Sequence, residues 1–280
     1  MYFAGVDIGS TMTKVAITSA DDMVLSSVSV YTGPEHRKLA NKVMEKALEG
    51  AGLPFNEISY IVATAYGRLN VPFADRQLTE LTCHARGVAS LFPDVRTAID
   101  IGGQDIKCMK VDNGKMVDFV MNDKCAAGTG RYIEVVADTL GVELEDMGKL
   151  SLKSTKKLTI TSFCTIFTQQ EVVARLSSGE KLEDLIAGVH DALAGTVGRL
   201  ALRLKIEPRV VLTGGVMKNV GMVKAMKENL NYEVFIPENP LLTGAIGAAI
   251  LGREITMQAL AKGEPIQTKD RHLTEASFFT

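Results

Sequence analysis

The residues with the most reactive chemistry in this chain are four cysteines, at positions 83, 108, 125 and 164. No two of them have CxxC spacing, so a zinc ribbon or a ferredoxin-type cluster site within one chain is not expected. Cys83 lies in a stretch with helical apolar periodicity, and Cys108 lies in the strand-like run IKCMKV. Both are therefore predicted to be small buried residues, the ordinary state of cysteine in a reducing compartment.

Cys125 and Cys164 have a different setting, because each precedes a stretch with helical periodicity, at 131–140 and 165–176 respectively. The N-terminus of a helix favours a thiolate and stabilises an anionic group. A [4Fe–4S] cluster needs four thiolates, and one chain offers two such cysteines. The sequence therefore predicts a cluster shared by two chains at a symmetry axis. A buried pair, a redox-sensing pair and an interchain zinc site are the alternatives.

Two glycine-rich loops indicate a second chemistry, the binding of nucleotide phosphates. Residues 7–11 (DIGST) and 100–104 (DIGGQ) each follow one predicted strand and precede another. Backbone N–H groups in such turns can bind phosphate, and an aspartate at a strand end can order Mg²⁺ through water. Lys14 would add a positive charge for a phosphate, and Gln104 could orient an attacking water. The motifs GxxxxGK[ST] and GxGxxG are both absent from the sequence, which argues against a P-loop and a dinucleotide fold.

A third glycine pair, at 214–215, follows a predicted strand at 209–213, and with Asn219 it would suit adenine and ribose. Asn219 is equally a common helix cap. The candidate catalytic residues are Asp7, Asp100, Gln104 and Asp105. The candidate nucleotide-binding residues are Gly9, Ser10, Thr11, Lys14, Gly102, Gly103, Gly214, Gly215, Val216, Asn219 and Gly244. The candidate metal ligands are Cys125 and Cys164.

An internal repeat organises the elements that must position these loops. Asp-Ile-Gly at 7–9 and Lys14 recur as Asp-Ile-Gly at 100–102 and Lys107, both at an offset of 93 residues. Each copy has the order strand, glycine turn, strand, strand, helix, which predicts two related α/β halves. The first half is expected to hold residues 1–97 plus about 245–280. The second is expected to hold 98–244, with an insertion at roughly 123–180 that carries Cys125 and Cys164.

Length and composition set the class of protein. The 280 residues suffice for about two domains, and 46% hydrophobic with 23% charged residues is typical of a globular chain. The net charge of −2 does not favour electrostatic binding to nucleic acid or to a membrane surface. No apolar run reaches the roughly 18 residues of a membrane helix, and the N-terminus lacks signal-peptide features. We therefore expect a cytoplasmic protein with no nucleic-acid or membrane partner.

Four motifs carry a resemblance to a known group of proteins. DIGST between two strands, IDIGGQD, LTGGV and GAIGAA resemble the phosphate-1, phosphate-2, adenosine and connecting motifs of the actin/Hsp70/sugar-kinase ATPase superfamily. Within it, IDIGGQDIK, MNDKCAAGTGR and TSFCTIF resemble the BadF/BadG/BcrA/BcrD-type ATPases. These are the activators of 2-hydroxyacyl-CoA dehydratases and the ATPase subunits of benzoyl-CoA reductases. The similarity runs from about residue 3 to residue 252, and the last 28 residues extend beyond it.

The resemblance implies an actin-like α/β fold, two related halves with a nucleotide cleft between them. It implies ATP, Mg²⁺ and a [4Fe–4S] cluster shared between two chains, in a homodimer or a heterodimer with a paralogue. The implied function is an ATPase that couples ATP hydrolysis to low-potential single-electron transfer to a 2-hydroxyacyl-CoA dehydratase. A ferredoxin or flavodoxin would be the electron donor. The alternative is an ATPase subunit held permanently by an aromatic acyl-CoA reductase, such as a benzoyl-CoA reductase.

Three further points stay open at this level. A superfamily small-molecule kinase and a non-catalytic ATP-dependent interaction module are lower alternatives, although the Asp base and sugar site of the sugar kinases are not recognisable here. The tail at 256–280 is either a docking arm that ends in Phe278-Phe279 or a loosely ordered segment. His84 and His190 lie in helical contexts with no metal spacing, so they are expected to be packing or surface residues.

Overall fold

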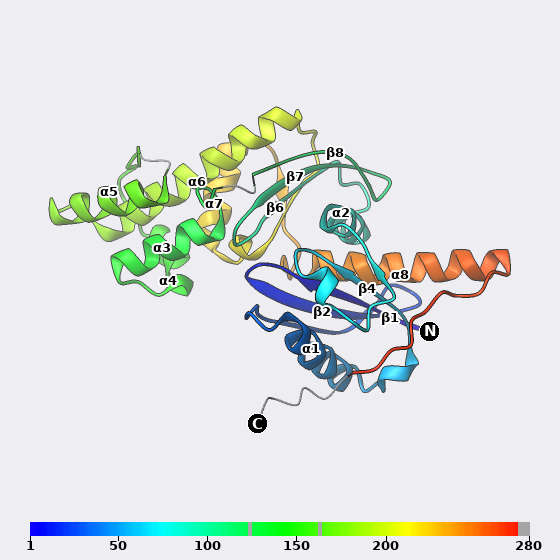
Figure 1. Ribbon diagram of the computed structural model, residues 1–280. Helices are drawn as coiled ribbons and strands as arrows, with labels where there is room; N and C mark the ends of the chain where they lie inside the picture. The colour runs from blue at the N-terminus through cyan, green and yellow to red at the C-terminus, as the bar shows by residue number, and fades with distance from the viewer. Residues whose placement is uncertain (123–124, 162–163, 274–280) are drawn as a thin grey trace, which may run out of the picture. The chain divides into compact units, whose positions relative to one another are not determined.

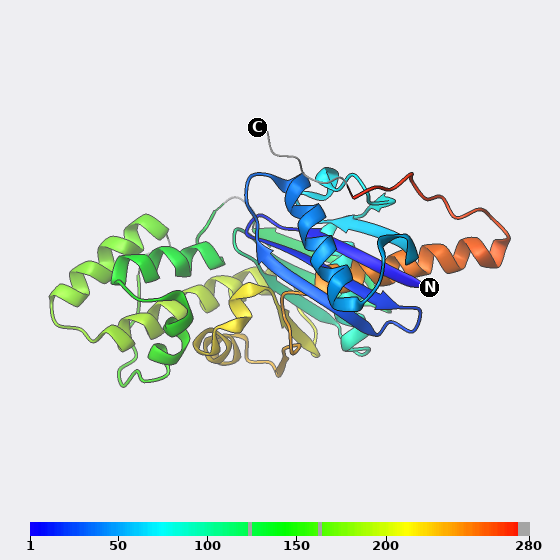
Figure 2. The same ribbon diagram turned by 90° about the horizontal axis from the view of Figure 1, so that it is seen from below.

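The computed structural model describes residues 1–122, 125–161 and 164–273. The chain forms two compact units (Figures 1 and 2). Unit 1 consists of Met1–Pro93, Val111–Met116 and the chain from Leu241 onward, and unit 2 consists of Asp94–Lys110 and Val117–Pro240. The structure contains two five-stranded sheets.

The sheet of unit 1 has the strand order β3-β2-β1-β4-β5. Its strands are β1 (Tyr2–Ile8), β2 (Met12–Ser19), β3 (Val24–Tyr31), β4 (Ile58–Thr64) and β5 (Arg76–Gln77). β1, β2 and β3 form an antiparallel meander, and β4 pairs in parallel with both β1 and β5. β1 and β4 are almost continuously buried, as expected for strands covered on both faces.

Helices cover both faces of this sheet. α1 (His36–Ala51) lies on one face, and α8 (Thr243–Lys262) lies on the other with α2 (Glu80–Leu91) packed against it (Figure 1). The alternation of β1 side chains explains this arrangement: Val6 packs in the α1 core and Phe3 in the α8 core. Gly5 has no room for a side chain, because the Ala245 carbonyl of α8 lies against it. Two short 3₁₀ helices complete the unit, at Phe55–Glu57 and Arg68–Asn70.

The sheet of unit 2 repeats that of unit 1. Its order is β10-β9-β6-β7-β8, so read from β8 it matches the first sheet strand for strand. Its strands are β6 (Thr97–Ile101), β7 (Ile106–Asp112), β8 (Lys115–Asn122), β9 (Val210–Thr213) and β10 (Val234–Phe235). β6 pairs antiparallel with β7 and parallel with β9, as β1 does with β2 and β4. The prediction of two related α/β halves is confirmed.

Unit 2 carries most of the helices. They are α3 (Gly130–Leu140), α4 (Leu144–Ser151), α5 (Thr165–Ser177), α6 (Leu182–Leu204), α7 (Val220–Leu230) and the 3₁₀ turn Gly215–Lys218. The apolar periodicity of residues 182–204 predicts a helix, and α6 has these bounds. It is long and apolar enough to span a membrane, but 56% of its most apolar window is buried and it packs in the core of unit 2. A core helix of a globular domain accounts for these properties.

The structure corrects some predicted boundaries. Apolar periodicity predicts a helix over 78–91, but the helix begins at Glu80, because Thr79 caps it by accepting a hydrogen bond from the Thr82 N–H at 3.3 Å. The run YEVFI at 232–236 predicts a strand, which the structure reduces to Val234–Phe235. α4 is absent from the sequence-based prediction, because eight residues are too few to define a helical period.

The described part of the C-terminal tail packs on unit 1. Residues 264–273, which we call the C-terminal strap, follow α8, and Leu273 contacts the core beneath α1. The Arg271 guanidinium lies 3.1 Å from Asp75 Oδ2 and also donates to the Ile58 carbonyl at 2.9 Å. The expectation of a loosely ordered tail is therefore wrong for the strap. Phe278-Phe279 lie outside the described residues, so their docking role stays a prediction.

Candidate functional site

The first glycine loop, in unit 1, is held by a buried ion pair. Asp7 and Lys14 face each other in the β1–β2 register, and Lys14 Nζ lies 3.0 Å from Asp7 Oδ1. The Gly9 N–H donates to the Met12 carbonyl at 3.0 Å and closes the turn between the strands. Asp7 is fully buried, and its Oδ2 has no hydrogen-bond partner among the described residues. A buried carboxylate oxygen without a donor is costly, so it fits a bound water or hydrated cation.

Ser10, Thr11 and Gly244 complete the candidate residues of unit 1. Ser10 is exposed and Thr11 half-buried in the turn after Gly9. Gly244 is the second residue of α8 and is buried. A side chain at this position would overlap Asp7 Oδ2. The structure thus brings Asp7, Lys14 and Gly244 together within unit 1.

The second loop, in unit 2, has the same construction. Asp100 faces Lys107 in the β6–β7 register, and the Gly102 N–H donates to the Asp105 carbonyl at 2.9 Å, as Gly9 does to Met12. Lys107 Nζ lies 2.7 Å from Asp105 Oδ1 and 3.8 Å from Asp100 Oδ2. The Thr213 hydroxyl donates to Asp100 Oδ1 at 2.7 Å. The two carboxylates therefore share one buried lysine, whose charge offsets part of theirs.

Other candidates of this loop lie at its tip. Gln104 is exposed, and Gly102 and Gly103 are half-buried. The carbonyls of these two glycines accept hydrogen bonds from the first turn of α3: Gly130 N–H to Gly102 at 2.8 Å and Arg131 N–H to Gly103 at 2.9 Å. Sequence reasoning missed this link and the bond between Thr213 and Asp100. Neither has a local signal, since each joins residues far apart in the chain.

The third loop follows β9. Gly214 has φ 92°, a conformation that favours glycine, and a side chain there would overlap the Ile101 carbonyl. Gly215 is exposed, and Val216 is buried at the start of the 3₁₀ turn. Asn219 caps α7, because its Oδ1 accepts from the Met222 N–H at 2.9 Å. The capping alternative for Asn219 is confirmed.

While its Oδ1 caps α7, the Nδ2 of Asn219 faces His190 within unit 2. Its Nδ2 lies 3.2 Å from His190 Nε2. An amide nitrogen donates, so this ring nitrogen accepts and His190 is neutral. Burial lowers the pKa of His190 to about 4, which agrees with a neutral ring. His190 is thus a packing residue, as expected.

The four cysteines divide into two pairs. Cys83 and Cys108 are fully buried, and burial raises the pKa of each thiol to about 12. Both are therefore protonated core residues, as predicted. Cys125 and Cys164 are exposed. Cys164 is the N-cap residue of α5, and Cys125 lies five positions before the first residue of α3.

The backbone carbonyls of both exposed cysteines accept side-chain hydrogen bonds. The Asn122 amide donates to the carbonyls of Cys125, at 3.4 Å, and Ala127, at 3.3 Å. Thr168, in the first turn of α5, donates its hydroxyl to the Cys164 carbonyl at 3.1 Å and lies 3.3 Å from the Tyr132 hydroxyl. Tyr132 belongs to the first turn of α3, so this contact joins the two N-terminal turns.

Side chains of α5 bind Thr159 and Thr161, which precede Cys164 in the chain. The Glu171 carboxylate accepts from the Thr161 N–H at 3.0 Å and from the Thr161 hydroxyl at 3.0 Å. Arg175 bonds Glu171 at 2.8 Å and donates to the Thr159 carbonyl at 2.9 Å. Two exposed thiols on braced helix starts fit the ligand chemistry of an iron–sulfur cluster.

Comparisons with known proteins agree on one group. The model of the BadF/BadG/BcrA/BcrD ATPase family matches residues 4–252. The 2-hydroxyisocaproyl-CoA dehydratase activator of Clostridioides difficile is 44% identical over 256 residues, covering 89% of this chain and 94% of the relative. The (R)-2-hydroxyglutaryl-CoA dehydratase activating ATPase of Acidaminococcus fermentans is 41% identical over 251 residues, covering 89% and 96%.

Solved structures define the fold. The Clostridium difficile activator with bound ADPNP has a TM-score of 0.88 at 40% identity and covers 95% of this chain and 99% of its own. A ROK family glucokinase from Streptomyces griseus, with glucose and AMPPNP, has a TM-score of 0.56 at 15% identity, covering 91% and 100%, and shares the fold alone. The fold and its paired loops thus define an ATPase of the actin/Hsp70/sugar-kinase type. The chain belongs to the BadF/BadG/BcrA/BcrD ATPase family.

Proposed function

We propose that this protein activates a 2-hydroxyacyl-CoA dehydratase by ATP-driven transfer of single electrons. A [4Fe–4S] cluster would be bound by Cys125 and Cys164 of two copies of the chain. The observation that carries the proposal is the setting of these two cysteines in an ATPase fold: both are exposed, Cys164 is the N-cap of α5, and Cys125 lies in the loop that leads into α3. Relatives at 41–44% identity that are named as dehydratase activators or activating ATPases support the same acceptor.

The loops of each unit, taken separately, suit different parts of the nucleotide. In unit 1, the backbone at Gly9, Ser10 and Thr11 and the charge of Lys14 suit phosphates, and Asp7 Oδ2 suits a water of hydrated Mg²⁺. Mg²⁺ would neutralise phosphate charge there. In unit 2, Gly103 and Gln104 suit the reacting phosphate, and the backbone at Gly214, Gly215 and Val216 suits the nucleoside.

Asp100 and Asp105 share Lys107, so they would hold that loop and its bound water. Both polar groups of the Asn219 amide are engaged within unit 2. Asn219 would therefore contribute to the nucleoside site by fixing the start of α7.

The contact between the second loop and α3 provides a route from nucleotide to cluster. Gly102 and Gly103 accept hydrogen bonds from Gly130 and Arg131, and α3 follows the Cys125 loop. A nucleotide that moves the loop therefore moves the first turn of α3. ATP can shift the cluster environment in this way only if it binds more tightly to the protein with the loop in one position than with the loop in the other.

Alanine at Gly130 is expected to weaken this coupling. Its Cβ would lie 3.2 Å from the Gly102 oxygen and 3.3 Å from both Gly103 Cα and a Val216 methyl, so the loop must shift by a few tenths of an ångström. Gly130 does not have a positive φ, so alanine suits the helix. We expect ATP to change the rate at which a chelator removes iron from the wild type, by about fivefold or more, and to change it far less in the variant. Gly198→Ala, where a Cβ meets nothing within 4 Å, is the matched control. An ATP response retained in full by Gly130→Ala contradicts the route.

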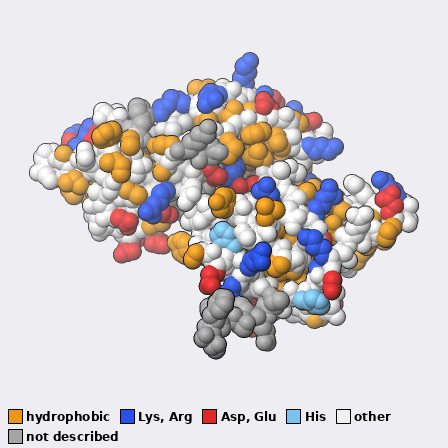
Figure 3. Space-filling view, viewed as in Figure 1, with side chains coloured by type: hydrophobic (Ala, Val, Ile, Leu, Met, Phe, Trp, Pro, Cys, Tyr) orange, Lys and Arg blue, Asp and Glu red, His pale blue; other side chains and the backbone are white. Residues whose placement is uncertain are grey.

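A second copy of the chain would complete the cluster. The exposed apolar side chains of α5, the helix that Cys164 begins, are Ile166, Phe167, Val173 and Leu176. Figure 3 shows hydrophobic side chains spread over the helices of unit 2. Burial of these side chains against another copy would favour a homodimer. A paralogue with the same two cysteines would serve equally. The donor would be a cytoplasmic ferredoxin or flavodoxin.

The direct test is activation of a dehydratase. Anaerobically purified protein, reduced with dithionite, is mixed with a 2-hydroxyacyl-CoA dehydratase and its substrate. We expect dehydration with MgATP and none with a non-hydrolysable analogue. Activation without ATP, or inactivity with reduced protein and MgATP across the dehydratases tested, contradicts the proposal.

Membership of a benzoyl-CoA reductase complex is the second candidate function. One of the benzoyl-CoA reductase subunits of Thauera aromatica is 28% identical over 261 residues, covering 89% of this chain and 92% of the relative. As a reductase subunit, the protein would be held in a heteromer, whereas as a dehydratase activator it would be a separate dimer. The size of the protein from its native host distinguishes them: co-purifying reductase subunits favour the second candidate.

A further inference from the structure

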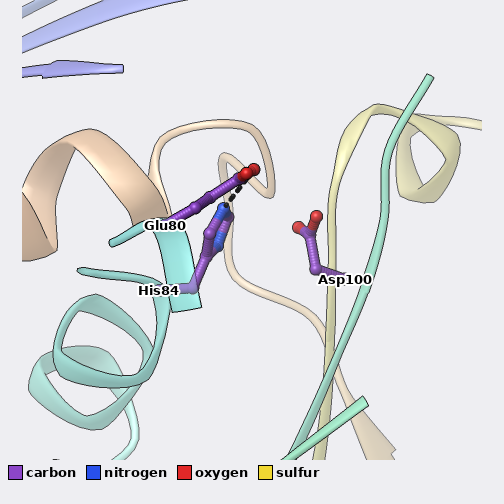
Figure 4. Close-up of side chains that lie close together, drawn as sticks. All are labelled: Glu80, His84 and Asp100. Atoms are coloured by element: carbon purple, nitrogen blue, oxygen red, sulfur yellow. Dashed lines mark ion pairs between the residues drawn. The ribbon is translucent and has the colours of Figure 1, made fainter. Parts of the chain in front are cut away.

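A buried histidine in unit 1 has polar partners that simple packing does not require. His84, on α2, is 3% exposed. Its Nδ1 lies 3.0 Å from the Thr243 hydroxyl. Its Nε2 lies 3.7 Å from the Glu80 carboxylate one turn earlier (Figure 4). Both ring nitrogens therefore face polar groups, which sets the orientation of the imidazole. The expectation that His84 is a simple packing or surface residue is incomplete.

The Thr243 contact places His84 next to the Asp7 carboxylate. Thr243 is the first residue of α8, and Gly244 follows it. A side chain at Gly244 would overlap Asp7 Oδ2 and would lie 3.1 Å from His84 Nε2. The α carbon of Gly244 is thus the surface against which the carboxylate oxygen and the imidazole both rest. A small displacement of the first turn of α8 would change the space around Asp7 Oδ2.

The rest of α8 is tightly fixed. Gly87 of α2 leaves no room for a side chain against the Thr243 carbonyl, and Gly247 of α8 leaves none against the Cys83 carbonyl. On the sheet side, Gly5 meets the Ala245 carbonyl in the same way. Backbone contacts therefore fix the distance of α8 from α2 and β1. The bond between Thr243 and His84 adds a side-chain contact at the first turn of α8.

We propose that His84, oriented by Glu80, is a positioning residue for ATP hydrolysis. It holds Thr243 so that Gly244, in the first turn of α8, stays beside Asp7 Oδ2 without displacing it, and this buried oxygen keeps its direction toward the water or hydrated cation of the reaction. It acts through Asp7 and takes no proton from substrate. The inference rests on the proposed ATP site, in which Asp7 belongs to the catalytic residues.

Valine at Thr243 tests the contact with little change of shape, because it replaces the hydroxyl by a methyl group. We expect kcat for ATP hydrolysis to fall on the order of 10–100-fold, the effect of a misplacement of about 1 Å. KM for MgATP should change little. Serine at Thr243 keeps the hydroxyl and should restore most of kcat. His84→Leu should lower kcat like Thr243→Val, and the double variant should lose no more than either single variant.

Thr256 provides the matched control. It is fully buried on the same helix, and its hydroxyl donates to the Gly252 carbonyl of that helix at 2.9 Å. Thr256→Val should leave kcat unchanged. An unchanged kcat in Thr243→Val, an equal loss in Thr243→Ser, or additive losses in the double variant overturn the inference. If Thr243→Val does not fold, His84→Leu takes its place. A lower kcat with little change in KM supports the inference, and an unchanged kcat overturns it. A wild-type protein that hydrolyses no ATP overturns the proposed site and this inference together.

Discussion

Replacing Cys164 with serine is expected to abolish the binding of iron and sulfide. Because the proposed cluster is shared by two copies, one substitution removes two of its four thiolates. Serine has nearly the same size but is a poor ligand for iron. Cys164 is exposed at the N-cap of α5, so the fold does not depend on its packing. Cys125→Ser should behave in the same way. The measurement is the iron and sulfide content of anaerobically prepared protein, together with its visible absorbance.

The other two cysteines are the controls for this experiment. Cys83 and Cys108 are fully buried, and their thiols are kept protonated by burial. Alanine at either position removes a thiol without removing a cluster ligand, so iron content per chain should stay at the wild-type value. Nucleotide binding should persist in the serine variants, because the glycine loops do not contain either exposed cysteine. Retention of iron by Cys164→Ser, or equal loss in a folded Cys108→Ala, contradicts the assignment.

The repeat and the loops were predictable because their signals are local. Asp7 and Lys14 recur 93 residues later, and in both copies the aspartate and lysine face each other across an antiparallel pair. Apolar periodicity sufficed for the bounds of α6, and glycine with its flanking strands sufficed for the turns. The division of the cysteines into two buried residues and two exposed residues also followed from local context. The buried ones lie inside a predicted strand or helix, and the exposed ones precede a predicted helix.

The remaining features depend on contacts between distant segments. Thr213 and Asp100 are 113 residues apart, and His84 and Thr243 are 159 apart. Neither pair has a spacing that a single sequence can reveal. The orientation of Asn219 was open for a related reason, because a capping amide and a nucleotide ligand have the same residue type. The position of the strap also escaped prediction, since polar tails with little periodicity have no preferred site.

Removing the charge of Arg271 in the strap is expected to destabilise unit 1 strongly. The side chain of Asp75 is fully buried, and that of Arg271 is 14% exposed. The Asp75 carboxylate also accepts from the N–H groups of Ile61, at 2.8 Å, and Lys269, at 3.0 Å. Arg271→Met keeps most of the apolar length of the side chain but leaves a buried carboxylate without its counter-charge. Losing one partner of a buried pair costs about 3–5 kcal/mol.

The pH dependence of this loss has a defined sign. Burial raises the pKa of Asp75, against the lowering effect of the backbone N–H groups of Lys269 and Ile61 and of the Arg271 charge. The folded state therefore keeps the proton to a higher pH than the unfolded state does, and protonation on lowering the pH favours folding. Without Arg271 the pKa of Asp75 rises further, so the deficit of the variant should be largest near neutral pH and shrink as the pH falls. Asp75→Asn combined with Arg271→Met should lose less than Arg271→Met alone.

A chain of two units need not unfold in a two-state transition, so a measurement within unit 1 is required. Hydrogen exchange at β4 provides it. The Ile61 N–H is bonded to Asp75 Oδ2, so its exchange reports the opening of this contact. Lys38→Met is the control in the same unit, because Lys38 pairs with Glu35 at 3.5 Å and the Glu35 side chain is 68% exposed. A surface pair contributes about 0–1 kcal/mol. A loss for Arg271→Met no greater than this would mean that the strap, which lies beyond the family match at 4–252, is not needed for the fold of unit 1.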